Sequence, residues 1–177
     1  MTPDELARHA ERLLAAHALG HADAAPLAGV LGRCAERRLS TGDALFEEGD
    51  PADELHFLLE GRVAVLKRDP AGQQRQIGVW FAPAILGGLA AVEAARRSAS
   101  CVAGAPSVVA ALDAGAAREV LGDPGPAGAE LRFILLSAFT EALANTTRHL
   151  RELLAEAPTA PAPDRDRLLA LLHGAKR

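Results

Sequence analysis

The spacing of apolar residues is helical at the start of the chain. The segment Thr2-Pro3-Asp4-Glu5 is a capping box with proline at the first helical position, which predicts a helix from about residue 3 to 18. A second short helix is predicted from Pro26. The residues expected to face inward from these two helices are Leu6, Ala10, Leu13, Leu14, Leu27, Val30 and Leu31. We expect both helices to cover one end of the fold that follows.

The period changes to two from Glu36 onwards. Short apolar runs up to Leu112 are separated by turn residues, and each run predicts a strand. The hairpin turn at 69–72 is followed by a strand expected over Gln76 to Trp80. The last two strands are expected over Arg97 to Ala103 and Ser107 to Leu112. Many short strands with regular turns are typical of an antiparallel roll. The predicted fold class is therefore α+β, with an antiparallel β-roll (a double-stranded β-helix or jelly roll), N-terminal helices and a long C-terminal dimerisation helix.

The C-terminal part returns to a helical period. A helix is expected from Asp113 to about Gly122 and a longer one over 127–157. Residues at alternating spacings of three and four on the longer helix form a seam typical of two-helix contacts, which predicts a homodimer through helix 127–157. The seam residues are Leu136, Phe139, Leu143, Thr146, Leu150 and Leu153.

Domain boundaries follow from these segments. We expect an N-terminal helical extension at 1–25, the β-roll with its long helix at 26–157, a Pro/Ala linker at 158–163 and a short terminal amphipathic helix at 164–177. The terminal helix could contact a separate protein partner or dock on its own roll, and the sequence favours neither.

Composition and charge exclude several classes of function. A net charge of -4 argues against a nucleic-acid surface, and no apolar window is long enough for a membrane span. The two cysteines form no CxxC motif, so the cytoplasm is the expected location. His17 and His21 have helical spacing but no third ligand, so we predict no metal and no cofactor. Because no catalytic motif is visible, we predict that the protein is not an enzyme.

One segment carries the residues that phosphate binding requires. Gly87 and Gly88 precede Leu89 and Ala90, and Arg97-Ser98-Ala99 follows. Glycine lets the backbone approach an anion, free amides at the start of a helical turn bind it, and a guanidinium pairs with its charge. This order predicts an anion site. The alternative for Arg97 is a surface charge beside Arg96.

A longer string of residues resembles a known family. The string comprises Gly42 with Phe46, the segments 48–53 and 55–61, Val63 with Val65, and residues 87–99. It resembles the cyclic-nucleotide-binding domain of the catabolite activator protein, protein kinase A regulatory subunits and cyclic-nucleotide-gated channels, over roughly residues 25 to 157. The resemblance implies a β-roll that holds a cyclic phosphate and a C-terminal helix that closes over the purine.

The resemblance also implies roles for individual residues. Arg97 corresponds to the arginine that pairs with the cyclic phosphate, Ser98 to its hydroxyl partner and Ala99 to an amide donor. Leu89 and Ala90 correspond to the turn whose amides contact the same anion. Thr146 and Thr147 match hydroxyl residues that contact the purine in the same subunit and across the dimer; the alternative is that Thr146 only fixes helix register.

One position departs from the family. After Gly87 the family has a glutamate that accepts a hydrogen bond from the ribose 2′-hydroxyl, and this chain has Gly88 there. Losing such a bond weakens binding by about ten- to a hundredfold. Glu93 is a possible substitute, although an exposed loop carboxylate is the simpler interpretation.

These observations predict a regulatory protein. We expect a stand-alone sensor that binds a cyclic nucleotide, possibly cAMP, and signals through an unidentified protein partner, because the residues after the long helix cannot form a helix-turn-helix with its wing. The alternative is a degenerate, ligand-free roll that acts as a protein adapter or structural module, which Gly88 favours.

Overall fold

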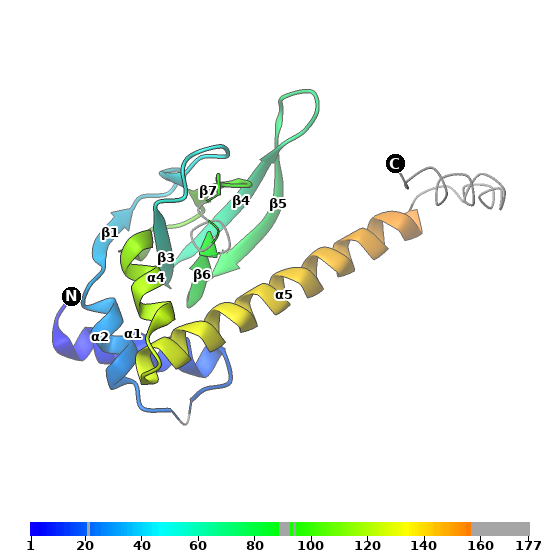
Figure 1. Cartoon of the computed structure of the whole chain (residues 1–177). Coiled ribbons are helices and arrows are strands. Elements are labelled where there is room, and N and C mark those ends of the chain that lie inside the picture. Colours follow the sequence, from blue (N-terminus) through cyan, green and yellow to red (C-terminus); the bar gives the residue numbers. More distant parts are fainter. Residues whose placement is uncertain (21, 89–92, 94, 157–177) are drawn as a thin grey trace, which may run out of the picture. The chain divides into compact units, whose positions relative to one another are not determined.

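The computed structural model describes residues 1–20, 22–88, 93 and 95–156, with only the backbone of residues 149, 150 and 152–156 (Figure 1). The chain divides into two compact units, Met1–Thr140 and Glu141–Arg177. The first unit contains the sheets and the residues around Arg97. The predicted linker at 158–163 and the predicted terminal helix at 164–177 lie outside the described residues.

Helices begin and end the described chain. Helix α1 spans Pro3–Ala16 and α2 spans Ala25–Leu31, while α4 (Ala114–Gly122) and α5 (Pro126–Glu156) follow the strands. The predicted capping box of α1 is present, because the Glu5 amide donates to the Thr2 hydroxyl and the Thr2 amide donates to the Glu5 carboxylate. The first helix ends at Ala16, two residues before the predicted end.

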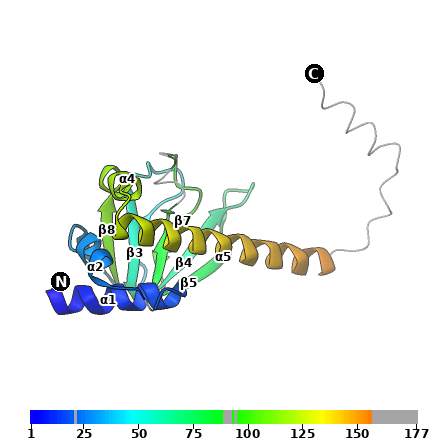
Figure 2. The ribbon, with the colours of Figure 1, turned by 60° about the horizontal axis from the view of Figure 1, so that its bottom comes forward.

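The strands form two antiparallel sheets of four (Figure 2). One sheet has the order β1-β8-β3-β6 and the other β2-β7-β4-β5. The bounds are β1 Ala35–Leu39, β2 Ala44–Phe46, β3 Glu54–Glu60, β4 Arg62–Arg68, β5 Gln74–Phe81, β6 Ala84–Leu86, β7 Ser100–Ala103 and β8 Ser107–Asp113. Neighbours such as β3 and β8 are distant in sequence, as a roll requires. The predicted antiparallel β-roll with flanking helices is confirmed.

Gly61 makes the tight connection between β3 and β4 possible. Its φ of +86° lies in the left-handed region, and a Cβ there would lie 2.5 Å from the Pro106 carbonyl oxygen and 2.8 Å from Ser107 Cα. The Ser107 hydroxyl contacts both the amide and the carbonyl of Arg62, the next residue. Glycine is therefore required where two turns of the roll meet.

Two apolar clusters hold the first unit together. The larger one joins α1, α2, α4 and the start of α5 to the faces of β3 and β8 that point away from the other sheet, and its largest fully buried side chain is Phe57. The smaller one lies between the sheets and is built from Leu58, Val63, Ala84, Leu86, Cys101 and Val109. The N-terminal helices therefore pack against one end of the roll, as their apolar faces predict.

Candidate functional site

The backbone of Arg97 is fixed by the turn that precedes β3. The Arg97 amide donates to the Asp50 carbonyl (2.8 Å), and the Gly49 amide donates to the Arg97 carbonyl (2.9 Å). Next to it, Arg96 pairs with Pro51 in an isolated bridge. Residues 95–97 are thus attached to residues 49–52, which lie more than forty positions earlier in the chain.

The Arg97 side chain points into the protein and is 3% exposed. Its Nη1 donates to the carbonyl oxygen of Gly87 (3.0 Å), and its Nη2 donates to that of Glu54 (2.6 Å). The guanidinium carbon lies 4.2 Å from the centre of the Phe46 ring, which is a cation–π contact. Arg97 is therefore not a surface charge, whereas Arg96 is exposed.

No carboxylate pairs with this buried guanidinium among the described residues. The ion pairs of the described chain leave Arg97 out, and its Nε has no hydrogen-bond partner there. Burial lowers the pKa of Arg97, and the charge of Asp53 acts most strongly in the opposite direction. A buried charge without an ionic partner is costly, so this position favours binding of an anion.

Gly87 is the close neighbour of the guanidinium. Its φ of +66° favours glycine, and a Cβ at this position would overlap Arg97 Nη1. The Gly87 carbonyl accepts a hydrogen bond from the same nitrogen. Gly87 therefore lets the backbone approach the arginine closely, as the glycine-rich motif predicts.

His56 is the second buried polar side chain beside Phe46. It is 1% exposed, and its ring centre lies 5.5 Å from that of Phe46. Its Nε2 lies 3.2 Å from a carboxylate oxygen of Glu54, whose other oxygen pairs with Arg37. Burial lowers the pKa of His56 to about 3, and the charges of Arg97 and Arg37 act in the same direction.

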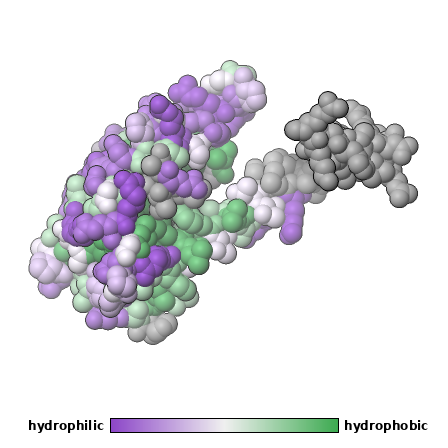
Figure 3. All heavy atoms as spheres, in the orientation of Figure 1, coloured by the Kyte–Doolittle hydropathy of each residue, from purple (hydrophilic) through white to green (hydrophobic). Residues whose placement is uncertain are grey.

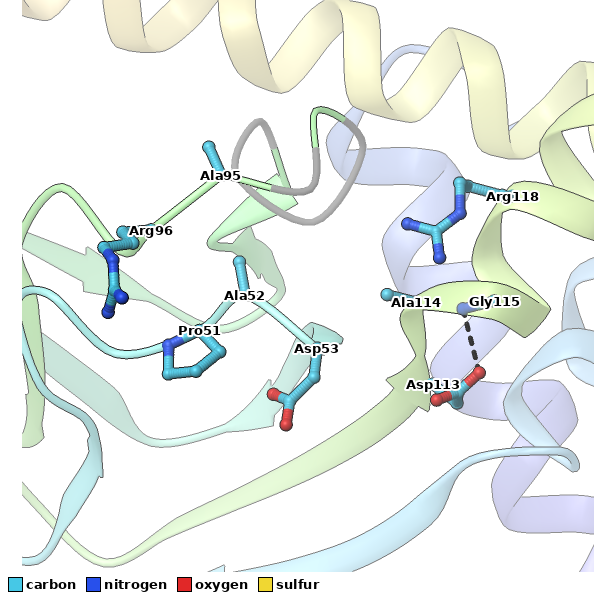
Figure 4. Close-up of a pocket in the computed structure, with 9 residues that line it drawn as sticks. All are labelled: Pro51, Ala52, Asp53, Ala95, Arg96, Asp113, Ala114, Gly115 and Arg118. Carbon is cyan, nitrogen blue, oxygen red and sulfur yellow. Dashed lines mark hydrogen bonds between the residues drawn. The ribbon is translucent and has the colours of Figure 1, made fainter.

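An open pocket borders the segments that hold Arg97. It has a volume of about 520 Å³ and is lined by Pro51, Ala52, Asp53, Ala95, Arg96, Asp113, Ala114, Gly115 and Arg118. Figure 4 shows the carboxylates of Asp53 and Asp113 along its lower side and the guanidinium of Arg118 above them. Arg97 is not part of this lining. Sequence analysis did not predict the pocket, because its walls come from three separate segments.

Comparisons with known proteins place the roll in a family. The family model described as cyclic nucleotide-binding domain matches residues 36–123. Residues 36–123 belong to this family. The match runs from β1 to the end of α4 and includes Gly87, Gly88 and Arg97. The resemblance that these residues predicted is confirmed.

Solved structures are similar to this cyclic nucleotide-binding domain over most of the chain. One from Methylobacillus flagellatus, also a cyclic nucleotide-binding domain, is 25% identical, with a TM-score of 0.71 and coverage of 87% of each chain. The N-terminal domain of a transcriptional regulator from Streptomyces coelicolor is 25% identical, with a TM-score of 0.57, and the match covers 89% of this chain and 99% of that one. The global regulator CLP from Xanthomonas campestris, described as c-di-GMP responsive, is 19% identical, with a TM-score of 0.68 and coverage of 88% and 73%, and shows the fold alone. No curated protein matches the chain.

The cyclic nucleotide-binding domain brings some predicted site residues together. Gly87 and Arg97 are in contact. Gly88, which follows Gly87 in the chain, is buried. Ser98 is exposed and Ala99 is half-buried, and both lie in the bend before β7. Leu89 and Ala90 lie outside the described residues. Glu93, the possible substitute for the family glutamate, is exposed.

The predicted base contacts lie in the second unit. Thr146 and Thr147 are exposed on α5, and the Thr146 hydroxyl donates to the Ala142 carbonyl one turn earlier (2.9 Å). Their role stays a prediction. Sequence analysis missed Glu54 and His56 as neighbours of the arginine; a polar residue inside the apolar run of β3 was the available signal for His56.

Within the ranges given above, no group of three or more His, Cys, Asp or Glu could hold a metal ion. In that same part of the chain, every helix is too short or too polar to cross a bilayer.

Proposed function

We propose that this protein is a regulatory sensor that binds a cyclic nucleotide, possibly cAMP, at Arg97. The phosphate would contact the guanidinium together with Gly87, Gly88, Ser98 and Ala99 and the amides of Leu89 and Ala90. In this proposal Thr146 and Thr147 contact the base. Binding would shift α5 between two placements, since a ligand biases an equilibrium by its differential affinity.

The observation that carries the proposal is the uncompensated charge of Arg97. The side chain is 3% exposed and contacts two backbone carbonyls and an aromatic ring. Its Nε is buried and has no hydrogen-bond partner among the described residues, so this donor is left unsatisfied there. A phosphate oxygen at this nitrogen would supply the missing negative charge and a strong hydrogen bond.

The output in this proposal is a protein contact and not DNA. A net charge of -4 supports it, because nucleic-acid surfaces are normally basic. Exposed apolar side chains on α5, at Phe133, Leu136 and Leu143, support a homodimer through this helix. Figure 3 shows hydrophobic atoms at the surface in the region where Figure 1 draws α5. The proposed role is regulatory and involves no cofactor or catalytic group.

A second candidate is a ligand-free adapter that keeps the roll for protein contacts. Gly88 supports it, because the glutamate that binds ribose in the family is missing. An adapter would ignore nucleotides, whereas a sensor that binds them in its folded state must become more stable in their presence.

Calorimetry with cAMP and with cGMP tests the proposal. Wild type should release or absorb binding heat with at least one nucleotide. Arg97→Ala should weaken binding by about 30-fold or more, because it removes one partner of a buried charge pair. Arg96→Ala is the matched control, since Arg96 is adjacent but exposed and donates to the Gly49 carbonyl; its affinity should change little.

A second variant, Arg97→Lys, tests the proposal if Arg97→Ala does not fold. Arg97→Lys keeps the charge and most of the stem but loses the planar fork, so it should fold and bind more weakly than wild type. Circular dichroism reports the folding of each variant. Absence of heat with both nucleotides on folded wild type would exclude the sensor and favour the adapter.

A further inference from the structure

Strand β5 lies at the edge of its sheet (Figure 1). At eight residues it is the longest of the described strands, and β4 is its one neighbour among them. Its other edge therefore presents backbone N–H and C=O groups that pair with no strand in the described part of the chain. Such an edge is a template for a further strand unless charges, proline or other segments protect it.

The second half of β5 carries large apolar side chains that face solvent. Ile77, Val79 and Phe81 are 54%, 39% and 65% exposed. The other large hydrophobic side chains that the described residues leave exposed all lie on α5. Residues 77–81 include no charged residue and no proline, so neither of these devices protects this part of the edge.

The exposed side chains share one face of the strand. Residues 78–81 pair regularly with residues 62–65 of β4, and the register shift lies opposite Ile77. Trp80 packs against the smaller apolar cluster between the sheets. Because successive side chains of a strand point to opposite faces, Val79 and Phe81 point outward.

This segment is complementary to itself when two copies run antiparallel. With Val79 opposite Val79, Ile77 comes opposite Phe81, and such aromatic and β-branched pairs attract across strands. In the same register Gly78 comes opposite Trp80, and an aromatic ring covers the backbone beside a glycine. The space beside Gly78 is open, since a Cβ there would have no described atom within 4 Å outside its chain neighbours.

The charges of β5 do not oppose this pairing. Its one charged residue is Arg75, which forms an ion pair with Asp69 of the same hairpin. In the register centred on Val79, the two copies of Arg75 lie at opposite ends of the interface, about 26 Å apart at the usual rise per residue. A second copy therefore brings a strand of matching pattern without placing like charges of β5 side by side.

We propose that two copies of this chain join their β5 strands edge to edge and antiparallel, around a two-fold axis at Val79. The interface is isologous, and the sheets of the two copies form one continuous sheet across it. Residues 77, 79 and 81 of both copies then form one apolar cluster on its outer face. The interface uses residues other than those of the seam on α5, and it does not depend on nucleotide binding.

Cross-linking through one introduced cysteine tests the register. Directly opposed residues of an antiparallel pair have Cβ atoms about 4.5–5.5 Å apart, so a small adjustment lets two cysteines form a disulfide. Val79→Cys should form a covalent dimer in air with a copper catalyst, as seen on a non-reducing gel. Arg75→Cys is the matched control, and it should cross-link at least about tenfold more slowly because its copies are far apart.

Wild type controls for the native cysteines. Cys34 is half-buried and Cys101 is buried, and burial raises the pKa of each thiol to about 12, so both should react slowly. Equal cross-linking rates for Val79→Cys and Arg75→Cys would overturn the pairing of two copies and leave this edge to a strand of another protein.

Sedimentation equilibrium in a Leu143→Asp background measures the β5 contact apart from the seam on α5. Val79→Lys should weaken the remaining association by about tenfold or more, because two lysines would face each other across the axis. Gln74→Lys adds the same charge at an exposed polar position outside the paired segment, so it should change the association little. Circular dichroism checks that each variant folds. A Leu143→Asp chain that stays monomeric at every concentration would overturn the proposal.

Discussion

Arg97 and His56 are buried polar residues that both contact the ring of Phe46. Arg97 keeps its charge and lacks an ionic partner among the described residues, whereas the depressed pKa of His56 keeps its ring neutral at physiological pH. A neutral imidazole beside a guanidinium avoids repulsion. The neutral His56 therefore does not add to the free-energy cost of burying the Arg97 guanidinium.

The neutral state of His56 predicts a loss of stability in mild acid. Burial lowers the pKa of His56 in the folded protein from its ordinary value of 6.5 to about 3, so its contribution to stability is complete above pH 6.5 and is lost as the pH falls towards 3. Between pH 7 and pH 5 the free energy of unfolding should fall by about 2 kcal/mol from this residue. Urea titrations at both pH values measure the change.

His56→Leu should remove this part of the pH dependence. His9→Leu is the control, because His9 is only half-buried and burial lowers its pKa less strongly. If wild type and His56→Leu lose equal stability between pH 7 and pH 5, then His56 is not held neutral in the folded protein.

The sequence identified Arg97 but not its surroundings. The motif of residues 87–99 is local, so it could be read from the chain. The Glu54 carbonyl lies 43 positions earlier in the chain, and it reaches the arginine only in the folded protein, where residue 97 is hydrogen-bonded to residues 49 and 50. Contacts that depend on sheet register have no local signal.

At the scale of elements, the start of α4 depends on one carboxylate. Asp113 Oδ1 accepts hydrogen bonds from the amides of Gly115 (2.8 Å) and Ala116 (3.0 Å). Asp113→Ala should therefore lower the free energy of unfolding by about 1 kcal/mol, the usual effect of losing an N-cap. Chemical denaturation measures the difference.

Asp113→Asn provides the matched control, because asparagine caps helices about as well as aspartate. It should restore most of the stability lost in Asp113→Ala. An equal loss in both variants would show that the charge at this edge of the pocket, and not the cap, is what matters.

Element types were more predictable than their ends. The strand expected from Gln76 to Trp80 is β5, which extends from Gln74 to Phe81 because it pairs with β4 along its length. The strand expected from Arg97 begins only at Ser100. Residues 95–97 instead form backbone hydrogen bonds with the turn at 49–52. The alternation of apolar and polar residues cannot reveal such a tertiary contact.

Over the whole chain, helix α5 carries exposed apolar residues in both compact units. Leu136 is 64% exposed and Leu143 is 69% exposed, and their separation of seven residues matches one heptad. Phe139, predicted for the same seam, packs instead against the core of its own chain. The seam of a dimer would thus be narrower than the sequence predicts.

Charged substitutions on this seam test the homodimer. Leu136→Asp or Leu143→Asp should weaken self-association by about 100-fold or more, since each would bury an unpaired charge. Sedimentation equilibrium over a range of concentrations measures the change. Ala144→Asp carries the same charge next to Leu143 but points away from the seam, so it should not affect association; a monomeric wild type would show that the predicted dimer is wrong.

The attachment of Arg97 to the turn at 49–50 and to the carbonyls of Gly87 and Glu54 affects the entropy of binding. A free arginine side chain loses up to about 2 kcal/mol of rotamer freedom when it is immobilised. Here that cost is incurred during folding, before any anion arrives. A ligand that contacted the guanidinium would therefore find its rotamer already fixed, and this part of the entropy cost would not be incurred on binding.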